Sequence, residues 1–150
     1  MRRRVRETPA VSSLLDTHVW LWYVGSDSSR LAPAVRRRLE DEQERSKLHV
    51  SDISFWEVAL KSAKGKLSLS TDLVAWLADA ARLPRYSHLP VDRDILIASA
   101  TLRDTPPSDP VDCILIATAR NFGMTLVTAD RAILAYAART GALRVLDARV

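Results

Sequence analysis

Four acidic residues stand at points where a folded chain could gather them: Asp16, Glu57, Asp112 and Asp130. Asp16 and Asp130 each follow a short apolar run, whereas Glu57 and Asp112 lie near the starts of predicted helices. Several carboxylates within ~6 Å of one another repel and tend to protonate, unless a cation joins them. Mg²⁺ and Mn²⁺ prefer oxygen ligands, and such an ion activates water and stabilises charge on a phosphodiester. The set therefore predicts metal-dependent phosphodiester chemistry.

Helix capping explains each acid, taken singly, better than metal binding does, because acidic side chains favour helix N-termini. Ser54 and Glu57 have the spacing of a capping box. Asp109 followed by Pro110 is a typical helix start. The two acids that follow strands fit caps of the next helices, with Thr128 as an alternative cap for the later one. The combination of four acids, rather than any one of them, favours a metal site.

Short apolar runs alternate with helical patterns along the chain. Strands are predicted at 11–15, 48–50, 87–91, 125–128 and 143–146, and helices at 18–24, 34–45, 54–64, 71–82, 95–102, 110–121 and 131–139. This alternation predicts an α/β sandwich with a mostly parallel sheet. Ligands of such sheets bind beyond the carboxyl ends of the strands, which is where the four acids fall.

Composition narrows the class of protein. The chain has 150 residues, enough for one domain, with a net charge of +4 that permits a phosphate-backbone partner. One cysteine favours a reducing compartment, so a cytoplasmic location is expected. The three histidines are scattered, which disfavours zinc, and no apolar run is long enough to span a membrane. Residues 1–10 are predicted to be a flexible basic segment preceding a domain at 11–150.

Other polar and aromatic residues have less specific interpretations. Lys61 and Lys64 follow Glu57 along its helix and are candidates for RNA contact, although a solvated face explains them equally well. Residues 36–38 predict a solvated basic helix face, and Asp94 is assigned a helix-capping role. Four tryptophans occupy apolar helical positions, which favours core or dimer packing over base stacking: Trp20, Trp22, Trp56 and Trp76.

Four motifs occur in a characteristic order. They are LLDTHVWLW at 14–22, ISFWEVA at 53–59 with GKL at 65–67, DPVD at 109–112 with IATA at 116–119, and LVTAD at 126–130. Together they resemble the PIN-domain family and, within it, the VapC-type ribonuclease toxins of bacterial type II toxin–antitoxin pairs. The resemblance extends from about residue 14 to the end of the chain.

This resemblance implies a three-layer α/β/α sandwich and RNA cleavage that depends on Mg²⁺ or Mn²⁺. It assigns Asp16 and Asp112 as the firmest metal ligands, Glu57 as a ligand or an aid to water activation, and Asp130 to a water-mediated or second-metal role. Thr128 matches a supporting hydroxyl. The resemblance also implies a homodimer and a cognate VapB-like antitoxin that covers the acidic site, with DNA bound only through the antitoxin complex.

One motif departs from the family pattern. Many relatives have His-x-Asp-Pro-x-Asp-Arg where this chain has Ser108 and Cys113 in place of the histidine and arginine. No metal ligand is lost, so the departure is expected to affect the choice of substrate. Two alternative functions stay open: a catalytically silent PIN-like module that acts with its partner in transcriptional autoregulation, and a nuclease of the same fold directed at DNA.

Overall fold

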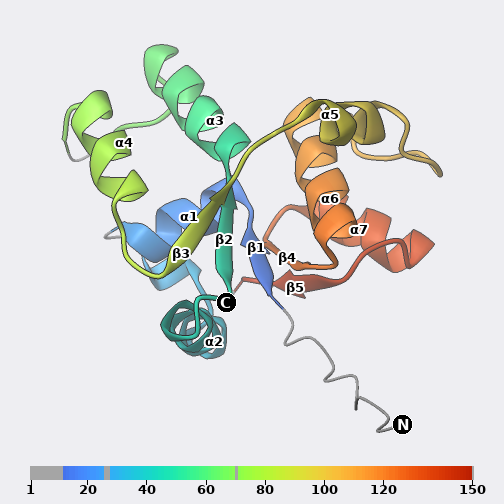
Figure 1. Ribbon diagram of the computed structural model, residues 1–150, viewed down its shortest axis with the longest axis horizontal. Coiled ribbons are helices and arrows are strands. Elements are labelled where there is room, and N and C mark those ends of the chain that lie inside the picture. The colour runs from blue at the N-terminus through green and yellow to red at the C-terminus, as the bar shows by residue number, and fades with distance from the viewer. Residues whose placement is uncertain (1–11, 26–27, 70, 150) are drawn as a thin grey trace, which may run out of the picture.

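A parallel sheet forms the centre of the molecule. The computed structural model describes residues 12–25, 28–69 and 71–149, so the predicted flexible segment at 1–10 lies outside them. The strands are β1 (Ser13–Leu15), β2 (Leu48–Ser51), β3 (Tyr86–Leu89), β4 (Thr125–Thr128) and β5 (Val145–Asp147), in the order β3-β2-β1-β4-β5 (Figure 1). Every pairing between them is parallel, which confirms the predicted sheet.

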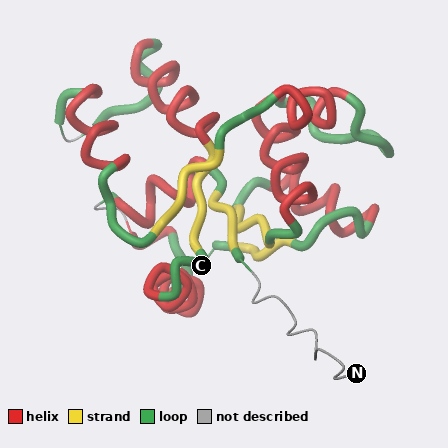
Figure 2. The backbone as a smooth tube through the Cα atoms, viewed as in Figure 1, coloured by secondary structure: helices red, strands yellow, loops and turns green. Residues whose placement is uncertain are grey.

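Helices cover both faces of this sheet (Figures 1 and 2). One side carries α1 (Thr17–Val24), α2 (Pro33–Glu44), α3 (Asp52–Ala63) and α4 (Leu73–Ala81), with a short 3₁₀ turn at Ser28–Arg30. The other side carries α5 (Arg93–Ala100), α6 (Pro110–Phe122) and α7 (Arg131–Thr140). The three-layer α/β/α sandwich is therefore confirmed. No described helix has the length and apolarity that a membrane crossing requires.

Alternating side chains of the central strand serve two separate cores. Leu14 packs with residues of α6 and α7, whereas Leu15 packs with residues of α1, α2 and α3. In the sheet register Leu15 lies beside Val50 and Val127, and all three are fully buried. Burial of each such side chain contributes roughly 1.5–3 kcal/mol. Because both faces are covered, the carboxyl edge of the sheet is left to form a site.

The tryptophans differ in how far they are buried. Trp20 is fully buried and packs against the rings of Phe55 and Trp76, at centroid distances of 4.8 and 5.3 Å. Trp22 is half-buried against the same core. Trp56, in contrast, is 54% exposed on α3 and takes no part in the core. Core packing is thus confirmed for Trp20, whereas for Trp56 only the predicted dimer packing stays open.

On the α5–α7 side of the sheet, the structure confirms one predicted helix cap and corrects another. Asp109 caps α6 by accepting a hydrogen bond from the Val111 amide at 2.8 Å, as predicted. The capping role assigned to Asp94 is wrong, because Asp92 caps α5 and accepts from the Ile95 amide at 2.9 Å. The helix begins one residue after Asp92, so Asp94 is an exposed side chain within its first turn.

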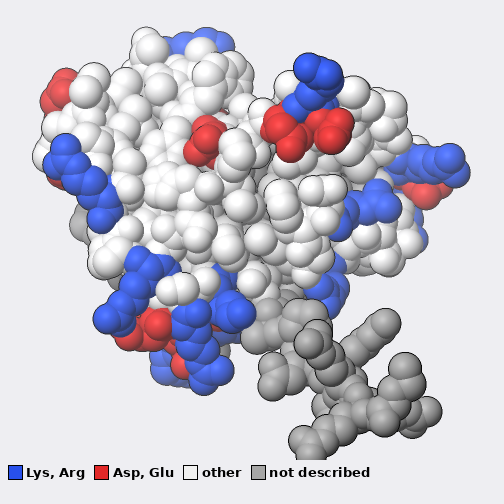
Figure 3. Space-filling model, in the orientation of Figure 1, with Lys and Arg blue, Asp and Glu red and all other residues white. Residues whose placement is uncertain are grey.

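The basic run at 36–38 forms a solvated, ion-paired helix face. Along α2, Arg36 pairs with Glu40 at 4.0 Å and Arg38 pairs with Glu42 at 3.1 Å. Figure 3 shows basic side chains gathered at this end of the molecule with acidic ones among them. Such i,i+4 pairs contribute only about 0.3–0.5 kcal/mol each. Two of the three arginines of this run are thus ion-paired along α2, in agreement with the predicted solvated helix face.

Candidate active site

Asp16 lies at the carboxyl end of the central strand and is almost completely buried, with 5% of its surface exposed. Its Oδ1 accepts a hydrogen bond from the Thr17 amide and its Oδ2 accepts one from the Thr128 hydroxyl, each at 2.7 Å. Burial raises the pKa of Asp16, while the hydrogen bonds from Thr128 and Thr17 and the nearby His18 oppose that rise. The carboxylate is also the N-cap of α1, so the capping prediction for it is confirmed.

Thr128 connects two of the four acids. Its buried hydroxyl donates to Asp16 and accepts a hydrogen bond from the Asp130 amide at 3.0 Å. Asp130 caps α7, because its Oδ1 accepts from the amides of Ala132 and Ile133 at 2.8 and 3.1 Å. The cap is therefore Asp130 rather than Thr128, and capping occupies only one of the two carboxylate oxygens of Asp130.

Glu57 lies in the second turn of α3, and the predicted capping box is wrong. The N-cap is Ser51, whose Oγ accepts from the Ile53 amide at 3.1 Å. β2 runs directly into α3 without a loop, so the helix begins before Ser54. Glu57 is 8% exposed, and its Oε1 lies 3.7 Å from the Lys61 Nζ. Its carboxylate is thus free of any capping duty.

Asp112 lies in the first turn of α6 and is 9% exposed. Burial is the largest cause that raises the pKa of Asp112 to about 8, and the negative charges of the neighbouring acids contribute the rest of the rise, in the order Asp130, Asp109, Asp16 and Glu57. All three other predicted acids therefore act on Asp112. The sheet brings the four carboxylates, from residues up to 114 positions apart, into one electrostatic environment at its carboxyl edge.

The donor chemistry of this cluster fits a hard divalent cation. The four side chains offer only oxygen, and their mutual repulsion favours a positive charge among them. Both carboxylate oxygens of Asp16 already accept hydrogen bonds. Only one of the two carboxylate oxygens of Asp130 takes part in capping α7. Within the described residues, no three Asp, Glu, His or Cys side chains are close enough as they stand to enclose an ion. The four acids therefore share one region, but as they stand in the described part of the chain they do not form a complete metal-binding site.

Two hydroxyl residues beneath the acids were missed by sequence reasoning. Thr17 and Ser54 are almost fully buried, and their hydroxyl oxygens lie 2.8 Å apart. This hydrogen bond joins the start of α1 to the first turn of α3, so it fixes the helices that hold Asp16 and Glu57 relative to each other. The available signal was a hydroxyl residue next to one acid and another one helical turn before the second.

The remaining predicted residues lie around the cluster with different surroundings. Lys61 is one turn from Glu57 and reaches it, whereas Lys64 is the exposed C-cap of α3. Cys113 is partly buried, and its Sγ donates to the Pro107 carbonyl at 3.1 Å. Burial, with Asp112 and Asp109, raises the pKa of the Cys113 thiol. The thiol that replaces the family arginine is thus turned toward the loop before α6.

Comparisons with known proteins agree with this fold. A family model of the PIN domain matches residues 13–139. Ribonuclease VapC22 of Mycobacterium tuberculosis is 30% identical over 118 residues, which are 79% of this chain and 86% of that protein.

Solved structures show the same fold at lower identity. A chain in DNA-bound VapBC from Salmonella typhimurium superposes with a TM-score of 0.65 at 19% identity, covering 92% of this chain and 98% of that one. FitAcB from Neisseria gonorrhoeae gives 0.63 at 21% identity, covering 90% and 96%. With the family model spanning most of the residues and a curated relative matched over most of its length, the chain belongs to the PIN-domain family and, within it, to the VapC type.

Proposed function

We propose that this protein is the endoribonuclease toxin of a toxin–antitoxin pair, acting in the cytoplasm and depending on Mg²⁺ or Mn²⁺. The observation that supports this most strongly is the buried Asp112, whose pKa is raised to about 8 by burial and by the surrounding acids. A cluster that repels its own charge gains most from a divalent cation. The relative VapC22 is a ribonuclease, which favours RNA as the substrate. Residues 11–150 are the proposed nuclease domain.

The chain's own residues would divide the work as follows. Asp16 and Asp112 would hold the cation, and Thr128 keeps Asp16 oriented through its hydrogen bond to Oδ2. When bound, the cation would supply an activated water and neutralise charge developing on the phosphodiester. Glu57 would bind the ion or accept a proton from the attacking water, and Asp130 would act through its uncapped oxygen. A phosphate held here would also lie near Lys61, beside Glu57.

The proposed partners follow from the solved relatives. VapBC assemblies are among the structures with this fold, and some of them are bound to DNA. We infer that this chain pairs with a cognate VapB-like antitoxin that covers the acidic edge and inhibits cleavage, that it forms a homodimer, and that it meets DNA only through that complex. A structured RNA such as tRNA is the proposed target, with Lys61 and Lys64 as candidate contacts.

Isosteric amide variants test the nuclease directly. Asp112→Asn and Asp16→Asn remove a group that can ionise to bind the cation and keep the size of the side chain, so the fold is retained. We expect cleavage of RNA in Mn²⁺ to fall at least about a hundredfold in either variant, and growth arrest on expression to be lost. Asp94→Asn, an exposed acid at the start of α5, is the matched control and should cleave normally.

Three outcomes would replace this proposal. Undiminished cleavage in both amide variants would show that the acids are not catalytic. If the wild-type chain leaves RNA intact in Mn²⁺ while its antitoxin complex binds DNA tightly, the silent binding module is the better description. Preferential cleavage of single-stranded DNA over RNA of the same sequence would indicate the DNA-directed nuclease.

A further inference from the structure

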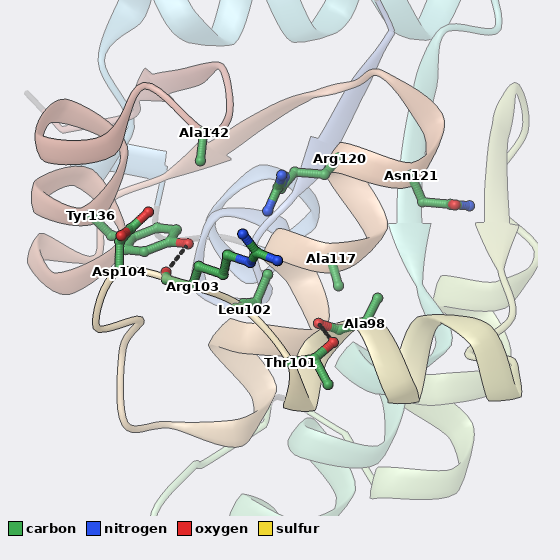
Figure 4. A pocket seen from close by; sticks show the side chains of 10 residues that line it. All are labelled: Ala98, Thr101, Leu102, Arg103, Asp104, Ala117, Arg120, Asn121, Tyr136 and Ala142. Carbon is green, nitrogen blue, oxygen red and sulfur yellow. Dashed lines mark hydrogen bonds between the residues drawn. The ribbon is translucent and has the colours of Figure 1, made fainter.

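A cavity of about 480 Å³ lies against the second half of α6, away from Asp112 in the first turn of that helix. Its walls come from the end of α5, the following loop, the last turns of α6 and the middle of α7 (Figure 4). Arg120, which lines it, follows Asp112 by eight residues, or about 12 Å along the helix axis. A volume of this size is in the range of small-ligand sites in proteins. The cavity is therefore separate from the candidate active site.

Two arginines face each other across this cavity. The side chains of Arg103 and Arg120 extend from opposite walls, and in Figure 4 their guanidinium groups point toward one another. Both residues are exposed, and within the described part of the chain neither guanidinium has an ion pair or hydrogen bond. The carboxylate of Asp104, which also lines the cavity, is set apart from both of them in this view. Two like charges held together without a counter-charge favour an anion between them.

The loop that presents Arg103 is held in a strained form. Asp104 and Thr105 have φ angles of 63° and 56°, in the left-handed region that such residues rarely adopt. Three hydrogen bonds from α7 fix the carbonyls of this loop. The Tyr136 hydroxyl donates to the Arg103 carbonyl at 2.9 Å, and the Arg139 guanidinium donates to those of Asp104 and Thr105 at 2.6 and 2.9 Å. These bonds hold the backbone that carries Arg103 in place before any ligand binds.

Part of the cavity wall consists of small apolar side chains, while Thr101, Asn121 and Tyr136 bring polar groups to the rest. Ala98, Ala117 and Ala142 contribute only methyl groups, and Leu102 completes this lining. Guanidinium groups bind phosphate through paired hydrogen bonds, and a flat apolar lining suits a base or sugar. A single inorganic ion would leave most of the volume empty. We propose that this cavity binds a nucleotide, with its phosphate held between Arg103 and Arg120, either as a free nucleotide or as part of an RNA strand.

Calorimetric titration tests the proposal without relying on nuclease activity. The Asp112→Asn chain, without divalent cations, is titrated with adenosine 5′-monophosphate, with inorganic phosphate and with adenosine. We expect saturable binding of the monophosphate, weaker binding of phosphate and none of adenosine. The double variant Arg103→Ala/Arg120→Ala should lose about tenfold or more in affinity, because charge-assisted hydrogen bonds to phosphate are removed. Arg120→Lys, which keeps the charge without the fork, should bind with intermediate affinity.

A matched control and a second ligand make the result decisive. Arg82→Ala removes the same charge from an exposed position at the end of α4 and should bind like the parent chain. Binding of a short oligoribonucleotide distinguishes the two sources of phosphate. If the double variant binds RNA more weakly, the cavity takes a nucleotide of the strand, whereas unchanged RNA affinity with lost monophosphate binding indicates a free nucleotide. The absence of saturable monophosphate binding, or equal binding by the double variant with an unchanged unfolding temperature, would overturn the proposal.

Discussion

The acids of the candidate site differ in how their charges are compensated. Asp16 receives two hydrogen bonds and Asp130 receives two from backbone amides, so both are supported by donors. Among the described residues, no donor contacts the carboxylate of Asp112, and every neighbouring charge that shifts its pKa raises it. Ionising a buried carboxyl group that receives no hydrogen bond is costly, so the group keeps its proton to higher pH. The local charge imbalance is therefore concentrated at Asp112.

This imbalance predicts how stability depends on pH without metal. The pKa of Asp112 is raised from 3.8 to about 8 by folding, so between these values the folded chain retains a proton that the unfolded chain has released. The free energy of unfolding should consequently fall as the pH rises from about 4 to about 8. Asp112→Asn removes this contribution. Thermal unfolding in EDTA at pH 5.5, 7 and 8.5 should show a smaller loss of stability for the variant than for the wild type.

The exposed residue Asp94 supplies the control for this measurement. Asp94→Asn should follow the wild-type pH dependence, since Asp94 is exposed at the start of α5 and lies outside the acidic cluster. Asp16, whose pKa is also raised, remains in all three chains and so cancels in the comparison. Parallel curves for wild type and Asp112→Asn would contradict the electrostatic account of Asp112.

At the scale of the elements, the acids at the carboxyl edge of the sheet lie at or near the N-termini of helices. β1 ends at the residue just before the cap of α1, β4 ends two residues before the cap of α7, and β2 passes directly into α3. Asp16 and Asp130 are therefore helix caps as well as candidate site residues. Capping and metal binding are alternatives when each acid is considered alone, but capping uses only Oδ1 of Asp16 and of Asp130, so it does not by itself exclude metal binding.

A pair of neighbouring acids tests which residue caps α5. Asp92→Ala removes the acceptor for the Ile95 amide and should lower the free energy of unfolding by about 1 kcal/mol. Asp94→Ala removes an exposed acid of the first turn and should change it by less than about 0.5 kcal/mol. Urea unfolding of both variants gives the comparison. If Asp94→Ala lowered the free energy of unfolding as much as Asp92→Ala or more, Asp94 would be the cap of α5 instead.

The sequence was sufficient to predict which elements form, but not which polar residue begins each helix. The apolar periodicity located all five strands to within a few residues, and Asp109 with Pro110 was correctly identified as the start of α6. Ser54 was mistaken for a cap because spacing alone cannot show that β2 enters α3 without a loop. The hydrogen bond between Thr17 and Ser54 could not be predicted either, because it depends on how α1 and α3 lie relative to each other.

Across the whole molecule, the acidic edge joins both sides of the sheet. Glu57 comes from the α1–α4 side and Asp112 from the α5–α7 side, while Asp16 follows the strand between them (Figure 1). A cation shared by these residues would connect parts of the chain that otherwise meet only through their cores. Ions that bind the folded state alone stabilise it in proportion to the logarithm of their concentration. Metal binding is thus expected to appear as global stabilisation.

Mn²⁺ should raise the unfolding temperature of the metal-free wild-type chain. At a concentration of one hundred times the dissociation constant, the gain in unfolding free energy is about 2.7 kcal/mol for one site. Asp112→Asn should lose most of this gain, and Asp94→Asn should retain it. Thermal unfolding across a series of Mn²⁺ concentrations measures the effect, and EDTA should reverse it. An equal shift in the wild type and Asp112→Asn would place the ion elsewhere.

The strand order has a consequence for synthesis of the protein. β1 is completed early but lies in the centre of the sheet, between β2 and β4, and the hydrogen bond from Thr128 to Asp16 spans 112 residues. A nascent chain on the ribosome cannot bring these two residues together until β4 has emerged from the exit tunnel. The partly translated polypeptide therefore lacks the assembled acidic edge, and a ribonuclease of this topology would spare the transcript and ribosome that are producing it.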